Sequence, residues 1–177
     1  VKDKREYIAS GNKDNYNIDI YDLRTECLCN SLVAHKNGTP TVRYFLNEKE
    51  KNEYLISADF LKVVIGWDIG NNYNIIRKID YKYKGSILST LLLFNINNNN
   101  YIVTSSDDDK EDNSRVYSFE DGSFIKNIQG TNTNRTNYLL PWKHEDDCYI
   151  IELCANKISI NSIIKDDKYA ELTLNPE

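Results

Sequence analysis

The stretch V63-V64-I65-G66-W67-D68 begins with three β-branched residues and ends with a tryptophan followed by an acid. Such residues are typical of strands, so the stretch predicts a strand that closes on Trp67. An aromatic-acid pair closes a second run at I18-D19-I20-Y21-D22, and Tyr117 and Asn161 close two later runs. The chain therefore repeats one strand ending about every 45 residues, a period typical of propeller arrays with four strands per repeat.

Short apolar or alternating runs of strand length recur along the whole chain, and turn-forming residues separate them. No amphipathic helix pattern of convincing length interrupts them. The sequence therefore predicts an all-β fold of antiparallel strands. The runs lie near residues 7–10, 18–21, 27–32, 41–46, 54–58, 63–67, 75–79, 87–94, 101–105, 115–119, 124–128, 138–142, 149–153, 157–161 and 169–174.

The segments that follow two of the repeated endings also align without a gap. Residues 25–35 and 121–131 each contain a turn, a strand, and then a small residue followed by His or Thr. This register resembles the WD40 family, in which a Trp-Asp pair ends the third strand of a blade and a Gly-His pair precedes the next blade. The resemblance covers almost the whole chain and implies antiparallel four-stranded blades of a WD40-type β-propeller.

The resemblance divides the chain into four parts of one propeller domain. Residues 1–33 form a partial blade of three strands, 34–83 the blade with the full Trp-Asp, 84–130 a third blade and 131–177 a fourth. Four blades are fewer than such propellers usually hold, and an open ring leaves edge strands and a bare interior face. We therefore expect an incomplete propeller from a longer protein, which flanking sequence or another chain completes.

The resemblance also implies a buried hydrogen-bond network. In the family a Trp–Ser/Thr–His–Asp network spans the blade, and the matching positions are Trp67, Ser57 and His35. The family's Asp usually stands where this chain has Leu61, so either Asp59 substitutes for it through a bulged turn or the network lacks that member. We favour Asp59. In the first and third repeats, Tyr21 with Ser10 and Tyr117 with Ser105 match the Trp and the hydroxyl residue.

A functional interpretation would make His35 a catalytic base or a metal ligand. Buried polar networks of this kind mainly specify structure, so we interpret His35 as a core histidine with both ring nitrogens bonded. The run H144-E145-D146-D147-C148 lacks the second His of a zinc-protease motif, and G66-W67-D68-I69-G70 lacks the spacing of a phosphate loop. We predict no catalytic residue, no metal and no cofactor.

Charge and composition restrict the partners. The formal net charge of −5 gives no electrostatic footprint for phosphate, which argues against nucleic acid. No run approaches the roughly 18 apolar residues of a membrane span, and V1-K2-D3-K4-R5-E6-Y7 has no apolar signal-peptide centre. We expect a cytoplasmic protein without membrane insertion. Its four cysteines (Cys27, Cys29, Cys148 and Cys154) are expected to be buried, reduced core residues.

An acidic run lengthens one predicted loop. It lacks the central Gly and closing Glu of a calcium loop. In the WD40 resemblance this loop and the loop at residues 34–38 emerge on the face most often used for partners, where acidic residues could attract a basic surface. The candidate partner-facing residues are Lys36, Asn37, Asp107, Asp108, Asp109, Glu111 and Asp112.

The expected function is a non-catalytic scaffold that presents propeller loops to other proteins in an assembly. The alternative is a regulatory or substrate-docking module of a larger enzyme whose catalytic domain lies outside this chain.

Overall fold

The computed structural model describes residues 6–38, 41–47, 51–60, 63–80, 88–97, 99–106, 114–128, 136–144, 147–154, 157–163, 165 and 168–173. These residues contain fifteen strands and no helix. The prediction of an all-β fold is therefore confirmed. All strand pairs are antiparallel, and each pair joins strands that are neighbours in the sequence.

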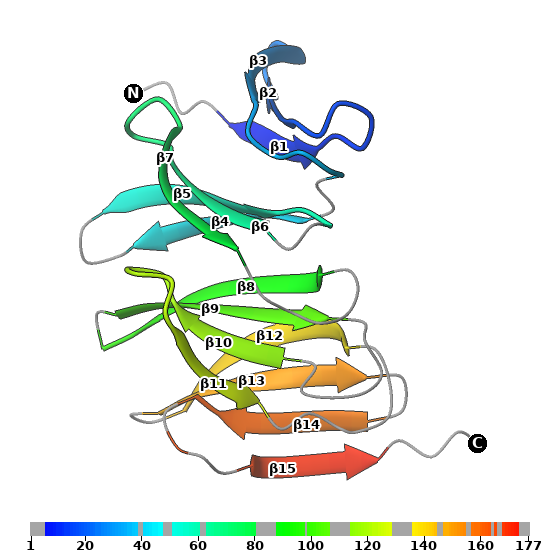
Figure 1. Cartoon of the computed structure of the whole chain (residues 1–177), viewed down its shortest axis with the longest axis vertical. Coiled ribbons are helices and arrows are strands. Elements are labelled where there is room, and N and C mark those ends of the chain that lie inside the picture. The colour runs from blue at the N-terminus through cyan, green and yellow to red at the C-terminus, as the bar shows by residue number, and fades with distance from the viewer. Residues whose placement is uncertain are drawn as a thin grey trace.

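The strands form four separate sheets that follow one another from the N-terminus to the C-terminus (Figure 1). The first sheet has three strands: β1 (Tyr7–Gly11), β2 (Ile18–Asp22) and β3 (Cys27–Leu32). The second has four: β4 (Thr41–Asn47), β5 (Asn52–Ala58), β6 (Val63–Asp68) and β7 (Asn74–Asp80). The third also has four: β8 (Leu88–Ile96), β9 (Asn99–Ser106), β10 (Ser114–Ser118) and β11 (Phe124–Ile128). The fourth consists of β12 (Thr136–His144), β13 (Asp147–Cys154), β14 (Lys157–Ser162) and β15 (Lys168–Thr173).

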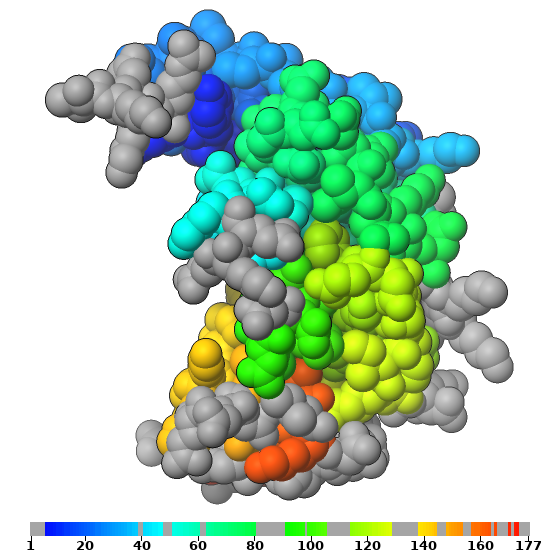
Figure 2. Space-filling view, turned by 90° about the vertical axis from the view of Figure 1, so that its left-hand side faces the viewer, coloured from blue at the N-terminus to red at the C-terminus, as the bar shows by residue number. Residues whose placement is uncertain are grey.

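The core lies between successive sheets. One apolar cluster joins the first sheet to the second through Ile18, Ile20, Leu55, Ile65 and Trp67. Two further clusters join the second sheet to the third and the third to the fourth. The space-filling view shows the sheets packed along the molecule in sequence order (Figure 2). Burial on both faces explains why the middle strands of the second sheet, β5 and β6, contain nearly continuous apolar runs, whereas its outer strands β4 and β7 alternate with polar residues.

Close packing between sheets also explains the glycine in the opening stretch. A Cβ atom on Gly66 would lie 2.8 Å from Cε2 of Phe119, which directly follows β10 of the third sheet. A Cβ atom essentially never lies so close to another carbon atom, so a side chain at residue 66 would displace the Phe119 ring. Gly66 therefore allows the second and third sheets to approach each other closely.

The four sheets repeat one local structure. In each sheet the pairing of the last two strands shifts register at the same place, immediately before Tyr21, Trp67, Tyr117 or Asn161. A β-bulge of this kind re-aims the following side chain.

One backbone hydrogen bond repeats as well. In every sheet, the N–H two residues after Tyr21, Trp67, Tyr117 or Asn161 donates to a backbone carbonyl. That carbonyl lies at the start of the preceding strand or just before it, in β1, β5, β9 or β13 respectively. The bonds are Leu23 to Glu6 (2.9 Å), Ile69 to Glu53 (3.0 Å), Phe119 to Asn100 (2.9 Å) and Ile163 to Cys148 (2.9 Å). Tyr21, Trp67, Tyr117 and Asn161 therefore occupy equivalent places in their sheets.

Candidate functional site

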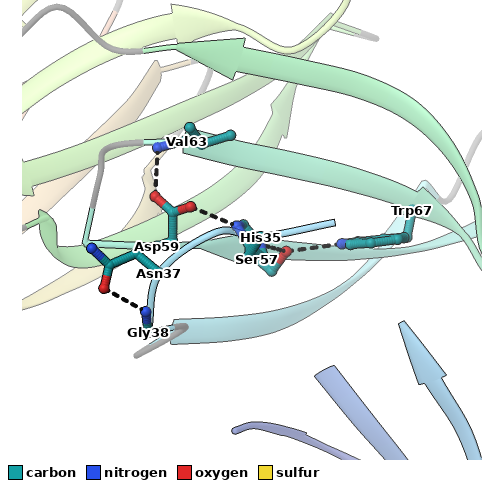
Figure 3. Close-up of polar contacts among 7 residues, drawn as sticks. All are labelled: His35, Asn37, Gly38, Ser57, Asp59, Val63 and Trp67. Atoms are coloured by element: carbon teal, nitrogen blue, oxygen red, sulfur yellow. Dashed lines mark hydrogen bonds and ion pairs between the residues drawn. The ribbon is translucent and has the colours of Figure 1, made fainter. Parts of the chain in front are cut away.

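The second sheet contains a chain of hydrogen bonds among four buried side chains (Figure 3). The indole Nε1 of Trp67 donates to Oγ of Ser57 at 2.8 Å. The same oxygen lies 2.7 Å from Nε2 of His35, and Nδ1 of His35 lies 3.0 Å from Oδ2 of Asp59. The structure thus brings together Trp67, Ser57, His35 and Asp59, all four of the residues predicted for the network.

Three elements position these side chains. Ser57 and Trp67 lie on the paired strands β5 and β6, where Trp67 is opposite Leu55. His35 comes from the segment between β3 and β4, and Asp59 directly follows β5. Asp59 also holds the β5–β6 turn, because its Oδ1 accepts the N–H of Val63 at 3.0 Å and its own N–H donates to the Val63 carbonyl at 3.1 Å. Leu61, the family's usual Asp position, lies outside the described residues.

One tautomer satisfies every donor in this network. Ser57 accepts from the indole and can donate its hydroxyl hydrogen to His35 Nε2. His35 then carries its hydrogen on Nδ1 and donates it to the Asp59 carboxylate. A buried donor left without a partner would cost about 1–3 kcal/mol, so a complete chain stabilises this arrangement of the core.

The order Asp59–His35–Ser57 has the atom pairing of a nucleophilic triad, with a carboxylate at Nδ1 and a hydroxyl at Nε2. Two features oppose that chemistry. Ser57 is 0% exposed, so its Oγ cannot reach a substrate, and that oxygen already accepts the indole N–H of Trp67. The geometry favours a structural role for the network.

The acid that follows Trp67 caps a turn. Asp68 Oδ1 accepts the N–H of Asn71, three residues ahead, at 3.2 Å. The equivalent residues do the same in the other sheets: Asp22 accepts from Thr25 at 3.2 Å, Ser118 from Asp121 at 3.5 Å and Ser162 from Lys165 at 2.8 Å. Short polar side chains suit such turns because they replace a backbone acceptor.

A second buried polar cluster, which the sequence did not suggest, lies between the third and fourth sheets. Glu152 is 0% exposed, and Ser114 and Ser159 donate to its two carboxylate oxygens, the latter at 3.2 Å. Nδ2 of Asn161 donates to Ser159 Oγ at 3.2 Å. Since Asn161 is opposite Ile150, Glu152 stands where the second sheet has Ser57. The available signal was an acid within the apolar run Y149-I150-I151-E152-L153.

The structure gives different results for Ser105 and Ser10, the hydroxyl residues predicted to accompany Tyr117 and Tyr21. Tyr117 is opposite Ile102, so the counterpart of Ser57 in the third sheet is Thr104 and not Ser105. Tyr21 is opposite Ile8, which puts Ser10 at the predicted register position, but Ser10 is exposed.

The predicted partner-facing residues fall into two groups. Lys36 is exposed, and Asn37 Oδ1 accepts the N–H of Gly38 at 2.8 Å. The segment is fastened to the β5–β6 turn, because Phe60 N–H donates to the Gly38 carbonyl at 3.1 Å and His35 bonds Asp59. The second group lies outside the described residues: Asp107, Asp108, Asp109, Glu111 and Asp112. It follows β9, as the 59–60 turn follows β5.

The cysteine prediction needs a correction. Cys27 and Cys29 are exposed on β3, the outer strand of the first sheet, whereas Cys148 is buried. The side chain of Cys154 is outside the described residues. Within the described part of the chain, no group of three or more His, Cys, Asp or Glu side chains could hold a metal ion. The same residues contain no helix long and apolar enough to cross a membrane.

The fold and this network define an all-β protein of successive antiparallel sheets that share one local structure. No family model matches the chain, and no curated protein matches it. Among solved structures, the crystal structure of the computationally designed Ika4 protein is similar over 98% of this chain and 88% of that chain. The TM-score is 0.62 and the sequence identity 14%, so the likeness concerns the fold alone.

Proposed function

We propose that the chain is part of a WD40-type β-propeller that acts in the cytoplasm as a non-catalytic scaffold for other proteins. Each sheet would be one blade. The repeated bulge, the repeated backbone bond and the Trp67–Ser57–His35–Asp59 chain support this assignment. Radial repetition of small antiparallel sheets is the architecture in which such repeats bury their faces against each other.

The scaffold role is supported mainly by the segment that the polar network holds in place. Both ring nitrogens of His35 are bonded inside the core, and the result is to fix the 33–38 segment on the second sheet. Lys36 on that segment remains exposed. A loop held by buried hydrogen bonds presents its exposed side chains without the ordering cost that weakens binding by mobile loops.

Exposed apolar side chains at both ends of the series support an incomplete propeller. Ile8 is 50% exposed, whereas its equivalents Leu55, Ile102 and Ile150 are 5%, 0% and 0% exposed because a preceding sheet covers them. In the fourth sheet, Tyr138 and Leu140 on β12 are 64% and 48% exposed. Further blades, from flanking sequence or from another chain, would bury these faces.

We further propose that the acidic segment attracts a partner with a basic surface, because electrostatic complementarity speeds association. After crosslinking in cell extract, we expect the parent chain to capture a partner protein. A variant with Asp107, Asp108 and Asp109 changed to Asn should no longer capture that protein. The charge-matched control changes Asp14 and Asp80 to Asn and Glu26 to Gln, all exposed residues in other segments. Equal capture by parent, variant and control would contradict a role for the acidic segment.

A further inference from the structure

The segment between β3 and β4 contains the one Asn-Gly pair in the sequence, Asn37-Gly38. Asparagine followed by glycine is chemically labile, because the backbone nitrogen of the second residue can attack the side-chain carbon Cγ of the first. Glycine has no Cβ atom to obstruct this approach. The five-membered ring that forms is a succinimide, and its formation in a folded chain depends on where that nitrogen and Cγ lie.

The side chain of Asn37 is folded onto the backbone nitrogen of Gly38 (Figure 3). The Gly38 N–H donates to Oδ1 of Asn37 at 2.8 Å. Because Cγ is bonded to that oxygen, it lies roughly 3–3.5 Å from the nitrogen, the separation of reacting atoms in a near-attack arrangement. In the succinimide, Cγ takes the place of the amide hydrogen. An N–H that points at the side-chain carbonyl is therefore already directed along the bond that forms.

Packing explains why residue 38 is a glycine. A Cβ atom on Gly38 would lie 2.8 Å from Cε2 of Phe60, and the Phe60 N–H donates to the Gly38 carbonyl at 3.1 Å. A larger residue would displace the Phe60 ring. The fold therefore requires a glycine directly after Asn37, which leaves the attacking nitrogen unobstructed. Asn37 is half-buried and follows the exposed Lys36, so water reaches its side chain.

A second asparagine has the same contact in a different setting. The Ser31 N–H donates to Oδ1 of Asn30 at 2.9 Å. This pair lies in β3, where both residues are paired with β2, so the strand holds the backbone in its extended form. The Ser31 side chain donates to Asp19 at 2.6 Å and is therefore fixed beside the nitrogen. Asn30 should react more slowly than Asn37 for both reasons.

The pair Asp121-Gly122 has a labile sequence but an unsuitable geometry. The Gly122 N–H donates to the Ser118 carbonyl at 3.0 Å, so it is directed to Ser118 and not to the Asp121 side chain. The Asp121 carboxylate accepts the Ser123 N–H at 2.9 Å instead. Among these three pairs, Asn37-Gly38 alone combines an unobstructed nitrogen with an N–H directed at the side-chain carbonyl.

We propose that Asn37 is a site of spontaneous deamidation, and that its isoaspartyl product releases the 33–38 segment from the β5–β6 turn. Hydroxide removes the Gly38 amide proton, the nitrogen forms a bond to Cγ of Asn37, and the Cγ–Nδ2 bond breaks with loss of ammonia. Water then opens the succinimide at one of its two carbonyl carbons. Opening at Cγ gives aspartate, whereas opening at the main-chain carbon gives isoaspartate.

Isoaspartate lengthens the main chain by one methylene group between His35 and Gly38. His35 bonds Asp59 at 3.0 Å and the Gly38 carbonyl accepts the Phe60 N–H, so the segment is fastened on both sides of Asn37. The longer main chain does not fit between these two attachments. Both products also place a new carboxylate beside the exposed Lys36. Deamidation is independent of the scaffold role, which stands if Asn37 proves stable.

The reaction is measured by incubating the full chain at mildly alkaline pH. Peptide mapping with mass spectrometry detects the conversion of each amide to an acid and separates aspartate from isoaspartate. We expect Asn37 to convert at least about tenfold faster than Asn30, and Asp121-Gly122 to keep its normal linkage. Asn37 should convert at least as fast in the folded chain as in a free peptide of residues 33–41, VAHKNGTPT. Conversion at the rate of Asn30, or slower than in the peptide, would overturn the proposal.

A pair of variants tests ring closure directly. Phe60→Leu makes room beside Gly38 for a methyl group. Adding Gly38→Ala should slow the conversion of Asn37 at least about tenfold relative to Phe60→Leu alone, because the new Cβ obstructs the nitrogen. Thermal unfolding by circular dichroism checks that both variants fold. Equal rates in the single and double variants would overturn the proposal.

Hydrogen exchange of the Phe60 amide tests release of the segment. The Gly38 carbonyl protects this amide in the parent, so the purified isoaspartyl product should exchange it at least about tenfold faster. The matched control is Asn37→Asp, which has the new charge with a normal main chain and should exchange this amide like the parent. Unchanged exchange in the isoaspartyl product, or equally fast exchange in Asn37→Asp, would overturn release through the lengthened main chain.

Discussion

Trp67 donates its indole N–H to Ser57 Oγ at 2.8 Å, across the paired strands β5 and β6. This single bond connects the tryptophan of the opening stretch to the segment that precedes the second sheet, since the same oxygen contacts His35. The neighbouring acid, Asp68, caps the next turn. The Trp-Asp pair therefore has two separate structural tasks, one in the core and one at the surface.

Two substitutions of Trp67 should distinguish the contribution of its packing to stability from the contribution of its hydrogen bond. Trp67→Ala should lower the free energy of unfolding by about 3–5 kcal/mol, as for other large-to-small core changes. Trp67→Phe retains most of the apolar volume but leaves Ser57 without its donor, so its cost should be smaller, about 1–3 kcal/mol. Urea unfolding measures both, with Trp142→Phe on β12 as the control. A Trp67→Phe variant as stable as the parent would contradict the role of the indole bond.

Ser57 and Asp59 should behave as one unit, because both contact His35. Ser57→Ala and Asp59→Asn should each destabilise the chain, and the double variant should lose less than the sum of the single losses. Residues in one hydrogen-bond network show coupling energies of about 0.5–3 kcal/mol. A double-mutant cycle by urea unfolding gives the coupling directly. Strict additivity would mean that His35 does not connect the two residues.

Gly66→Ala should destabilise the contact between the second and third sheets. The new methyl group would meet the Phe119 ring, and overpacking of a filled core costs about 1–3 kcal/mol. Phe119→Leu in the same chain makes room and should recover part of the loss. Gly70→Ala is the control, because the nearest atom to a Cβ there is Asp68 Oδ1 at 3.5 Å. A Gly66→Ala variant as stable as the parent would contradict the close approach of the sheets.

Asp121 should make stability depend on pH in the acid range. The Ser123 N–H, together with the Ser118 and Ser123 side chains, lowers the pKa of Asp121 from 3.8 to about 2. Its ionised form therefore stabilises the folded chain above the ordinary pKa, and this stabilisation is lost as pH falls toward about 2. The stability difference between the parent and Asp121→Asn should shrink between about pH 4 and pH 2.

Urea unfolding at several pH values follows that difference, with Asp14→Asn in another exposed turn as the charge-matched control. A difference that stays constant or grows as pH falls would contradict the assigned hydrogen bonds.

Much of this architecture was predictable because strand patterns and repeat spacing are local properties. The period placed Tyr21, Trp67 and Tyr117 in equivalent positions, and the structure puts a bulge before each of them. The partners of Trp67 followed from the family resemblance. Their geometry depends on the bulge, which sequence patterns do not reveal, and the same limit explains why Ser105 was chosen where Thr104 is the register equivalent.

Exposure was the least predictable property, because it depends on which sheet covers which face. Cys27 and Cys29 read as core residues, but β3 is an outer strand and both are exposed. Ile8 and Leu55 have equivalent positions and opposite exposure for the same reason, since a preceding sheet covers only Leu55. The buried Glu152 cluster forms only where the third and fourth sheets meet, so its serine partners could not be identified from spacing.

We have proposed that these four sheets are blades of an incomplete ring. Light scattering of the 177-residue chain over a range of concentrations tests it most directly, with thermal unfolding followed by circular dichroism. We expect a mass that rises above 20.6 kDa with concentration, and we expect the double variant Tyr138→Lys and Leu140→Lys, on the uncovered face of the fourth sheet, to suppress that rise. A monomer of 20.6 kDa at every concentration, with one cooperative melt, would mean that the four sheets are self-sufficient and would contradict the claim.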